Sequence, residues 1–234
     1  MARPVTVLAA HTWPSNAELI ADVAELYLDR DMLALDPTYG RGVWWQRWRP
    51  HHLIARSRDD DPDFDFRNLP YEDGLFELAA FDPPYVSVGG RRTTGIEEMH
   101  DRYGLTDAPT SPRALQAHNN LGLSEVWRVL TPGGFALVKV QDYISSGRLW
   151  EGTRFTGNHA AMVGFETVDR FEHVSPSPRP QPSKNPDGTP RRQVHARRNL
   201  STLLVLRKPK PRRCVTRCWS PKVNTVNDST TEES

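Results

Sequence analysis

The chain has 234 residues, of which 37% are hydrophobic and 25% are charged, so it is long enough for one large α/β domain or two very small ones. No apolar run approaches the roughly 18 residues of a membrane span, and we expect neither membrane association nor a signal peptide. The two cysteines, Cys214 and Cys218, exclude a disulfide scaffold and fit a reducing compartment, so we expect a cytoplasmic protein.

The net charge of +1 conceals an uneven distribution of charge. Residues 1–174 hold 17 basic and 25 acidic side chains, whereas residues 175–213 hold 11 basic side chains and one acid. The last 21 residues hold two bases and three acids. A basic segment after an acidic body is typical of a protein that binds a polyanion, although a solvated loop and tail would give the same counts.

The spacing of apolar residues predicts helices that alternate with short, nearly continuous apolar strands, and Ser15 is the expected N-cap of the first helix. In chain order, we expect a helix at 15–30, strands at 32–35, 53–55 and 75–81, a helix at 113–130, a strand at 135–140, a helix at 158–164, and strands at 165–174 and 200–206. This alternation predicts a mainly parallel sheet with helices on both faces, in which ligands bind beyond the carboxyl ends of the strands.

The segment Asp82-Pro83-Pro84-Tyr85 follows the expected strand at 75–81. Its two prolines remove two N–H donors and restrain φ twice, and Pro83 disfavours helical backbone at Asp82. The segment therefore presents a carboxylate, the free carbonyl of Pro83 and an aromatic ring. These groups suit a planar ring with an exocyclic amino group, because two acceptors can take its N–H bonds while Tyr85 stacks on its face. An ordinary turn at the end of a strand is the alternative.

A glycine-containing loop, Asp36-Pro37-Thr38-Tyr39-Gly40-Arg41-Gly42, follows the strand at 32–35. Gly40 and Gly42 allow positive φ and a close approach of the backbone to a ligand. No third glycine follows Gly42, which argues against a dinucleotide fingerprint and against a P-loop. A plain structural turn is the alternative interpretation.

Together these segments resemble the amino-group DNA methyltransferases, which methylate adenine N6 or cytosine N4 with S-adenosylmethionine. The family's Asp/Asn/Ser-Pro-Pro-aromatic loop is similar to residues 82–85, and its cofactor loop is similar to residues 36–42. The resemblance covers about residues 10–207 and includes the segments 65–70, 127–134 and 137–142. It implies a class I methyltransferase, Rossmann-like α/β fold with a mainly parallel seven-stranded sheet. We expect residues 1–208 to form this catalytic domain and residues 209–234 to be a disordered tail.

The resemblance also implies the roles of individual residues. The catalytic residues would be Asp82, Pro83, Pro84 and Tyr85. The residues that bind S-adenosylmethionine would be Thr12, Asp36, Pro37, Thr38, Gly40, Gly42, Asp59, Asp65 and Phe66. Rossmann-like sites usually place an acid at the end of the second strand, where it binds the ribose hydroxyls. No acid lies directly after the strand at 53–55, so Asp59 is the candidate for this role. A charged surface loop at 56–61 is the alternative. We expect no metal site, because no His or Cys pair with ligand spacing lies on a clear element.

The activity that the resemblance implies is methylation of the exocyclic amino group of a flipped DNA base, and Asp at position 82 favours adenine N6 over cytosine N4. An RNA base N-methyltransferase and a catalytically idle nucleic-acid-binding module are the alternatives. The enzyme would act in the cytoplasm of a bacterium or of a phage-infected cell, where restriction–modification is one possible setting. The sequence leaves its oligomeric state open.

No segment of domain size is left for recognition of a target sequence, so the loops 86–111 and 175–198 are the expected contacts to nucleic acid. The candidate phosphate ligands in these loops are Arg91, Arg92, Arg191, Arg192, Arg197 and Arg198. Other side chains have two interpretations each. Trp44, Trp45 and Trp48 are either core residues or a stacking surface, and Lys139 and Asp142 either face the site or form structural pairs.

Overall fold

The computed structural model describes residues 13–57, 61–84, 109–174, 185, 187–189, 192, 195–196 and 199–211. Every helix and strand expected from the sequence is present, with shifted boundaries, and a short hairpin is added. In chain order the elements are α1 (Asn16–Tyr27), β1 (Leu33–Asp36), η1 (Val43–Trp45), β2 (His52–Ala55), β3 (Phe76–Phe81), α3 (Pro112–Val129), β4 (Leu130–Val140), β5 (Tyr143–Ser145), β6 (Arg148–Trp150), α4 (Gly152–Val163), β7 (Glu166–Val174) and β8 (Leu200–Arg207).

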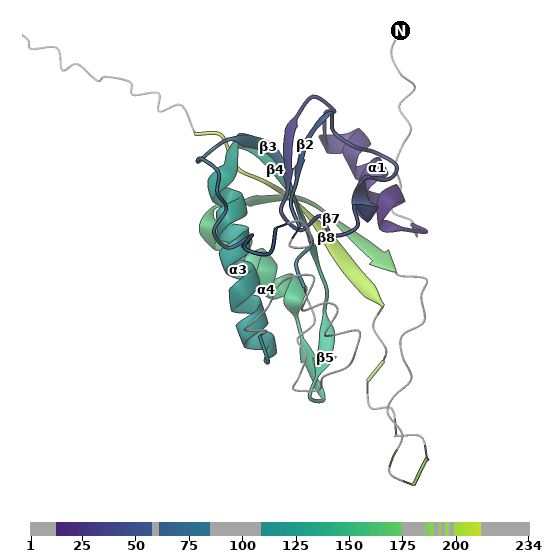
Figure 1. Cartoon of the computed structure of the whole chain (residues 1–234). Coiled ribbons are helices and arrows are strands. Elements are labelled where there is room, and N and C mark those ends of the chain that lie inside the picture. Colours follow the sequence, from purple (N-terminus) through teal and green to yellow (C-terminus); the bar gives the residue numbers. More distant parts are fainter. Residues whose placement is uncertain are drawn as a thin grey trace, which may run out of the picture.

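The main sheet of the described residues has six strands in the order β2-β1-β3-β4-β8-β7. Strands β2, β1, β3 and β4 are parallel, β8 is antiparallel to β4, and β7 is antiparallel to β8. Helices α3 and α4 cover one face of the sheet and α1 covers the other (Figure 1). The predicted α/β class, with a mainly parallel sheet between helices, is therefore confirmed.

The number of strands differs from the seven that we expected, since the described part of the sheet holds six. Residues 61–75, which precede β3, form turns. Aspartate side chains start these turns: Asp61 accepts a hydrogen bond from the backbone of Asp63 at 3.2 Å, and Asp65 accepts one from Arg67 at 2.8 Å. Such local bonds compete with a sheet ladder and favour turns.

Two predicted boundaries were also wrong. Helix α4 begins at Gly152, six residues before the expected start at 158, and the side chain of Asp142 accepts a hydrogen bond from the backbone of Thr153 at 2.9 Å. Strand β4 begins at Leu130 directly after α3, and its register with β3 shifts between Phe76 and Leu78. Asp142 therefore has a structural role at the start of α4, which is the second of its two interpretations.

The core has one cluster on each face of the sheet, and the three tryptophans belong to the cluster beside α1. Trp44, Trp45 and Trp48 are 6%, 5% and 8% exposed, which confirms the core interpretation of their rings. On the other face α3 packs very closely on the sheet. A Cβ at Gly122 would lie 2.5 Å from the Phe66 ring and 2.7 Å from the Phe81 ring, so only glycine fits there.

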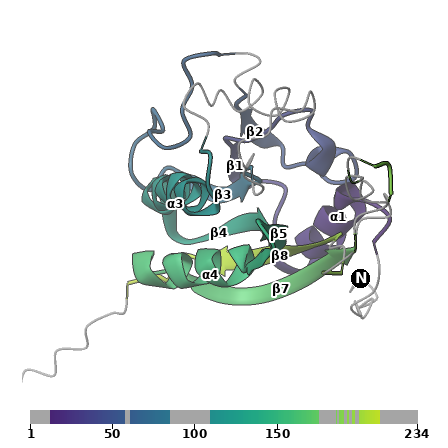
Figure 2. The ribbon, with the colours of Figure 1, turned by 90° about the horizontal axis from the view of Figure 1, so that it is seen from below.

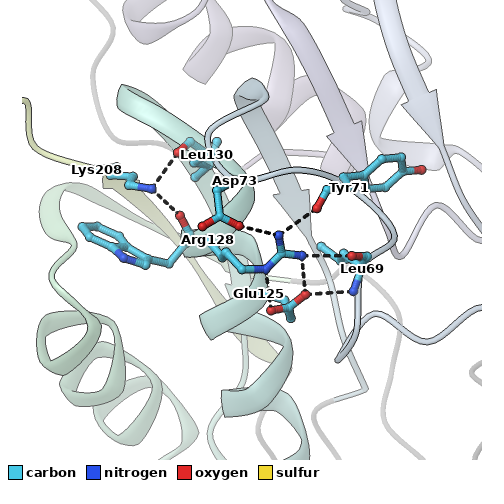
Figure 3. A network of polar contacts seen from close by, with 8 residues as sticks. Leu69, Tyr71, Asp73, Glu125, Arg128, Leu130 and Lys208 are labelled. Carbon is cyan, nitrogen blue, oxygen red and sulfur yellow. Dashed lines mark hydrogen bonds and ion pairs between the residues drawn. The ribbon is translucent and has the colours of Figure 1, made fainter.

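A polar network joins the end of α3 to the turns that precede β3 (Figure 3). The Arg128 guanidinium donates to the carbonyls of Leu69 and Tyr71 at 2.9 and 2.7 Å, and also binds the carboxylates of Asp73 and Glu125. Glu125 in turn accepts a hydrogen bond from the backbone of Leu69 at 2.9 Å. The network holds residues 69–73 against α3 although they carry no regular secondary structure.

Helices long and apolar enough to cross a membrane are absent from the described residues.

Candidate functional site

The candidate site lies at the edge of the sheet where β1 and β3 end side by side. This edge is on the side of β5, at the bottom of Figure 1, and Figure 2 views the molecule from that side. Asp36 is the last residue of β1 and Asp82 follows the last residue of β3. A cavity of about 310 Å³ opens between them. Its lining comes from α1, both strand ends and the glycine loop, and includes Asn16, Asp36, Thr38, Gly40, Arg41 and Asp82.

The Asp36 carboxylate is buried and accepts three hydrogen bonds. The indole Nε1 of Trp45 donates to one oxygen at 2.7 Å, and the backbone N–H and the hydroxyl of Thr38 donate to the other at 3.0 and 3.3 Å. Burial, and to a lesser extent the nearby Asp82 charge, raises the pKa of Asp36 to about 7, although all three hydrogen bonds favour the ionised form. Because its pKa lies near neutrality, Asp36 can lose its proton when a cation enters the cavity.

Asp82 forms hydrogen bonds with residues that follow β1, through both its backbone and its side chain. Its N–H donates to the Thr38 hydroxyl at 2.8 Å, and the indole Nε1 of Trp44 donates to its carboxylate at 3.2 Å. Burial raises the pKa of Asp82, while the Lys139 charge and the Trp44 hydrogen bond lower it. Asp82 and the loop 36–42, which lie far apart in the sequence, thus line the same cavity.

The glycines of the loop adopt the backbone that the sequence predicted. Gly40 and Gly42 have φ of +51° and +65°. A Cβ at Gly42 would lie 2.5 Å from the Tyr39 ring, whereas a Cβ at Gly40 would meet nothing closer than 3.8 Å. Gly42 is therefore required by both its conformation and its surroundings, and Gly40 by its conformation alone.

Asp65 and Phe66 are not among the residues that line this cavity. The Asp65 carboxylate is bound by the Arg67 guanidinium at 2.7 and 2.9 Å. Phe66 is 6% exposed and packs edge-on against Phe81 and His118, with ring centroids 5.4 and 5.1 Å away. Their assignment to the cofactor stays a prediction.

The other predicted site residues divide into two groups. Pro37 and Pro84 are buried, and Pro83 is buried beside a second, much smaller cavity between α3 and α4. Arg192 is described and exposed. The rest lie outside the described residues, as do Cys214, Cys218 and most of the loops 86–111 and 175–198: Thr12, Asp59, Tyr85, Arg91, Arg92, Arg191, Arg197 and Arg198.

Sequence reasoning missed the residues that hold the two carboxylates. Trp44 and Trp45 come after the glycine loop, separated from it by Val43, and the sequence indicated only core or stacking roles for them. One signal was available, because a buried indole N–H requires an acceptor and the nearest buried acids supply it. Asn16 and Arg41 of the cavity lining carried no comparable signal.

Comparisons with known proteins identify the fold. The sequence matches no protein-family model and no curated protein. A candidate methyltransferase from Bacillus halodurans C-125 superposes with a TM-score of 0.50 and 14% identity, over 82% of this chain and 99% of its own. That likeness shows the fold, and the chain accordingly has the Rossmann-like class I fold of S-adenosylmethionine-dependent methyltransferases.

A candidate DNA modification methylase from Thermus thermophilus is also similar, with a TM-score of 0.42 and 16% identity over 65% of this chain and 55% of its own. Its complex with S-adenosyl-L-methionine gives a TM-score of 0.41 and 18% identity, over 62% of this chain and 51% of its own. This chain thus spans about half the length of that methylase.

Proposed function

We propose that this protein transfers a methyl group from S-adenosylmethionine to the exocyclic amino group of a nucleic-acid base, with adenine N6 in DNA as the substrate. The observation that carries the proposal is that Asp82 and Asp36 face one cavity framed by the glycine loop. The Asp82 carboxylate, which would accept a hydrogen bond from the amino group of the base, therefore lies in the wall of the cavity that would bind the cationic methyl donor. The class I fold supports the same reaction class.

The cavity fits the proposed cofactor in size and charge. Its volume of about 310 Å³ lies at the lower end of the range typical of small-molecule sites. S-adenosylmethionine carries a sulfonium, an ammonium and a carboxylate, and when bound it supplies an electrophilic methyl on a good leaving group. Asp36 and Asp82 suit its cationic groups, and Arg41 suits its carboxylate. The positive-φ glycines let the backbone approach the ligand closely.

The residues at the end of β3 would make the amino nitrogen nucleophilic. An aromatic amine is a weak nucleophile because its lone pair is delocalised into the ring. Acceptance of its two N–H bonds by the Asp82 carboxylate and the Pro83 carbonyl favours a tetrahedral nitrogen with a free lone pair. This interaction strengthens toward the transition state, which is the requirement for catalysis. Asp82 need not be a strong base, because the nitrogen proton becomes acidic once the methyl group is attached.

A base inside a duplex is out of reach, so the target must leave the stack. We propose that Tyr85 stacks on the flipped base and that the arginines of the loops 86–111 and 175–198 contact phosphates. The basic segment at 175–213 supports a polyanionic substrate. Cytosine N4, an RNA base and an idle binding module remain the alternatives that experiment must separate.

Nucleoside mass spectrometry tests the proposal. The protein is incubated with S-adenosylmethionine and mixed-sequence duplex DNA or RNA, and the products are digested to nucleosides. We expect N6-methyladenine in DNA from the wild type, none from Asp82→Ala, and wild-type amounts from Asp31→Asn, an exposed control at the opposite edge of the sheet. N4-methylcytosine or a product in RNA alone would select an alternative substrate, and full activity of Asp82→Ala would refute the mechanism.

A further inference from the structure

Lys139 lies next to Asp82 because of the register between β3 and β4. The two strands are parallel, with Ala80 opposite Leu137 and Phe81 opposite Val138. The next step along both strands brings position 82 opposite position 139. Aligned neighbours in a parallel pair point to the same face of the sheet, and Ala80 and Leu137 show that this is the α1 face. The two side chains therefore emerge side by side at the edge of the sheet that carries the cavity.

The Lys139 side chain is buried, since the residue is only 3% exposed, and burial lowers the pKa of its ammonium group. Its Nζ donates a hydrogen bond to the Oδ1 of Asn16, a neutral residue of α1 that lines the cavity. A buried charge is costly unless an opposite charge or a hydrogen-bond acceptor compensates it. Asn16 supplies only an acceptor, and among the described residues the Asp82 carboxylate is the opposite charge that acts on Lys139.

Other charged and titratable groups of the described residues surround this pair. Asp36 faces Asp82 from β1 and disfavours a second negative charge in the cavity. Arg41 lines the same cavity from the glycine loop. His173 faces Lys139 from β7, and burial together with the Lys139 charge lowers its pKa and so favours its neutral form. At Asp82, the buried Lys139 thus offsets part of the repulsion between the buried Asp36 and the half-buried Asp82 carboxylates.

We propose that Lys139 is a positioning residue that keeps the Asp82 carboxylate ionised, and that methyl transfer depends on this cross-strand pair. The catalytic part of this inference rests on the proposed function. An ionised Asp82 only accepts hydrogen bonds, as an amino group requires, whereas a protonated Asp82 would turn a donor toward the substrate. Burial raises the pKa of Asp82 and lowers that of Lys139, and the attraction between the two charges opposes both shifts, because the Lys139 charge lowers the pKa of Asp82 and the Asp82 charge raises that of Lys139.

The ionisation of Asp82 can be measured without any activity. The indole Nε1–H of Trp44 donates to the Asp82 carboxylate, and that of Trp45 donates to Asp36. In ¹⁵N-labelled protein each indole resonance therefore reports the protonation of one carboxylate, and Trp44→Phe and Trp45→Phe assign the two signals. Wild type, Lys139→Met and Lys139→Arg are titrated with pH, and Lys210→Met is the control for loss of an exposed lysine charge.

We expect the Trp44 midpoint to rise by about one to three pH units in Lys139→Met, the usual effect of losing an adjacent opposite charge. The midpoint should stay near the wild-type value in Lys139→Arg and Lys210→Met. The Trp45 midpoint should not rise, because a neutral Asp82 repels Asp36 less. An unchanged Trp44 midpoint in Lys139→Met would overturn the inference. Lys139→Gln, which keeps a polar end toward Asn16, replaces the Met variant if that variant does not fold.

The methylation rate at saturating cofactor provides the second readout. In Lys139→Met we expect the acid limb of the pH–rate profile to move upward with the Trp44 midpoint and the rate to recover at higher pH. A uniform loss of rate at every pH would indicate a merely structural role and overturn the inference. A wild type without methylated product would refute the proposed function, whereas the Trp44 titration would still decide whether Lys139 controls Asp82.

Discussion

Asn119 of α3 donates a hydrogen bond from its side-chain Nδ2 to the backbone carbonyl of Pro84, 2.6 Å away. This bond holds the last described residue of the loop after β3 against the middle of a helix. Because the two prolines restrain φ, holding the Pro84 carbonyl also restrains the direction of the Pro83 carbonyl. The preceding helix residue, His118, contacts Phe66, so α3 supports the segments after both β2 and β3.

We predict that Asn119→Leu lowers the methylation kcat by about 10- to 100-fold, because small displacements of a positioned acceptor have effects of this size. Cofactor affinity should be unchanged, since Asn119 does not line the cavity beside Asp36. Single-turnover kinetics and calorimetry measure the two quantities. Asn120→Leu, the neighbouring amide on the same helix, is the matched control, and an equal loss of rate in both variants would contradict a specific role for Asn119.

Cofactor affinity should increase as the pH rises through 7. Asp36 has a pKa of about 7, and its ionised form is the one that attracts a cation. Below pH 7 binding must therefore expel a proton, and affinity should fall by up to about tenfold per pH unit. Calorimetry in two buffers of different ionisation enthalpy measures both the affinity and the proton release. A flat profile in the wild type would exclude Asp36 from cation binding, and Asp36→Asn should show that flat profile.

Gly42→Ala should destabilise the protein more than Gly40→Ala. Both variants place a side chain at positive φ, at a cost of about 1–2 kcal/mol, but only the Cβ at position 42 would collide with the Tyr39 ring. Urea unfolding gives the two free energies. The substitution Tyr39→Ala should recover part of the loss in the Gly42→Ala background and none in the Gly40→Ala background. Equal losses of unfolding free energy in the two single variants would show that the Tyr39 ring can move away from the added methyl group without a loss of stability.

Arg128→Met should lower the free energy of unfolding by about 2–3 kcal/mol, because it leaves two backbone carbonyls and two carboxylates without their shared donor (Figure 3). Arg207→Met removes a single exposed ion pair with Glu166 and should cost at most about 1 kcal/mol. Thermal and urea unfolding of both variants check the difference. Similar losses of unfolding free energy would mean that the Arg128 network stabilises the protein no more than a surface ion pair does.

Local signals in the chain were sufficient to predict the order of helices and strands and the two polar strand ends. Ser15 begins α1 as its N-cap, apolar runs specify β1 and β3, and prolines and glycines mark the segments that follow them. Local patterns did not predict the hairpin β5–β6 or the early start of α4, because the apolar patterns of these segments are short and weak.

Which side chains meet at the site depends instead on long-range packing. Trp44 reaches Asp82 across 38 positions and Asn119 reaches Pro84 across 35. Lys139 stands beside Asp82 only because β3 and β4 pair in one particular register. A shift of one residue would turn every side chain of a strand to the other face, so such neighbours follow from the packing of the whole sheet and not from any local pattern.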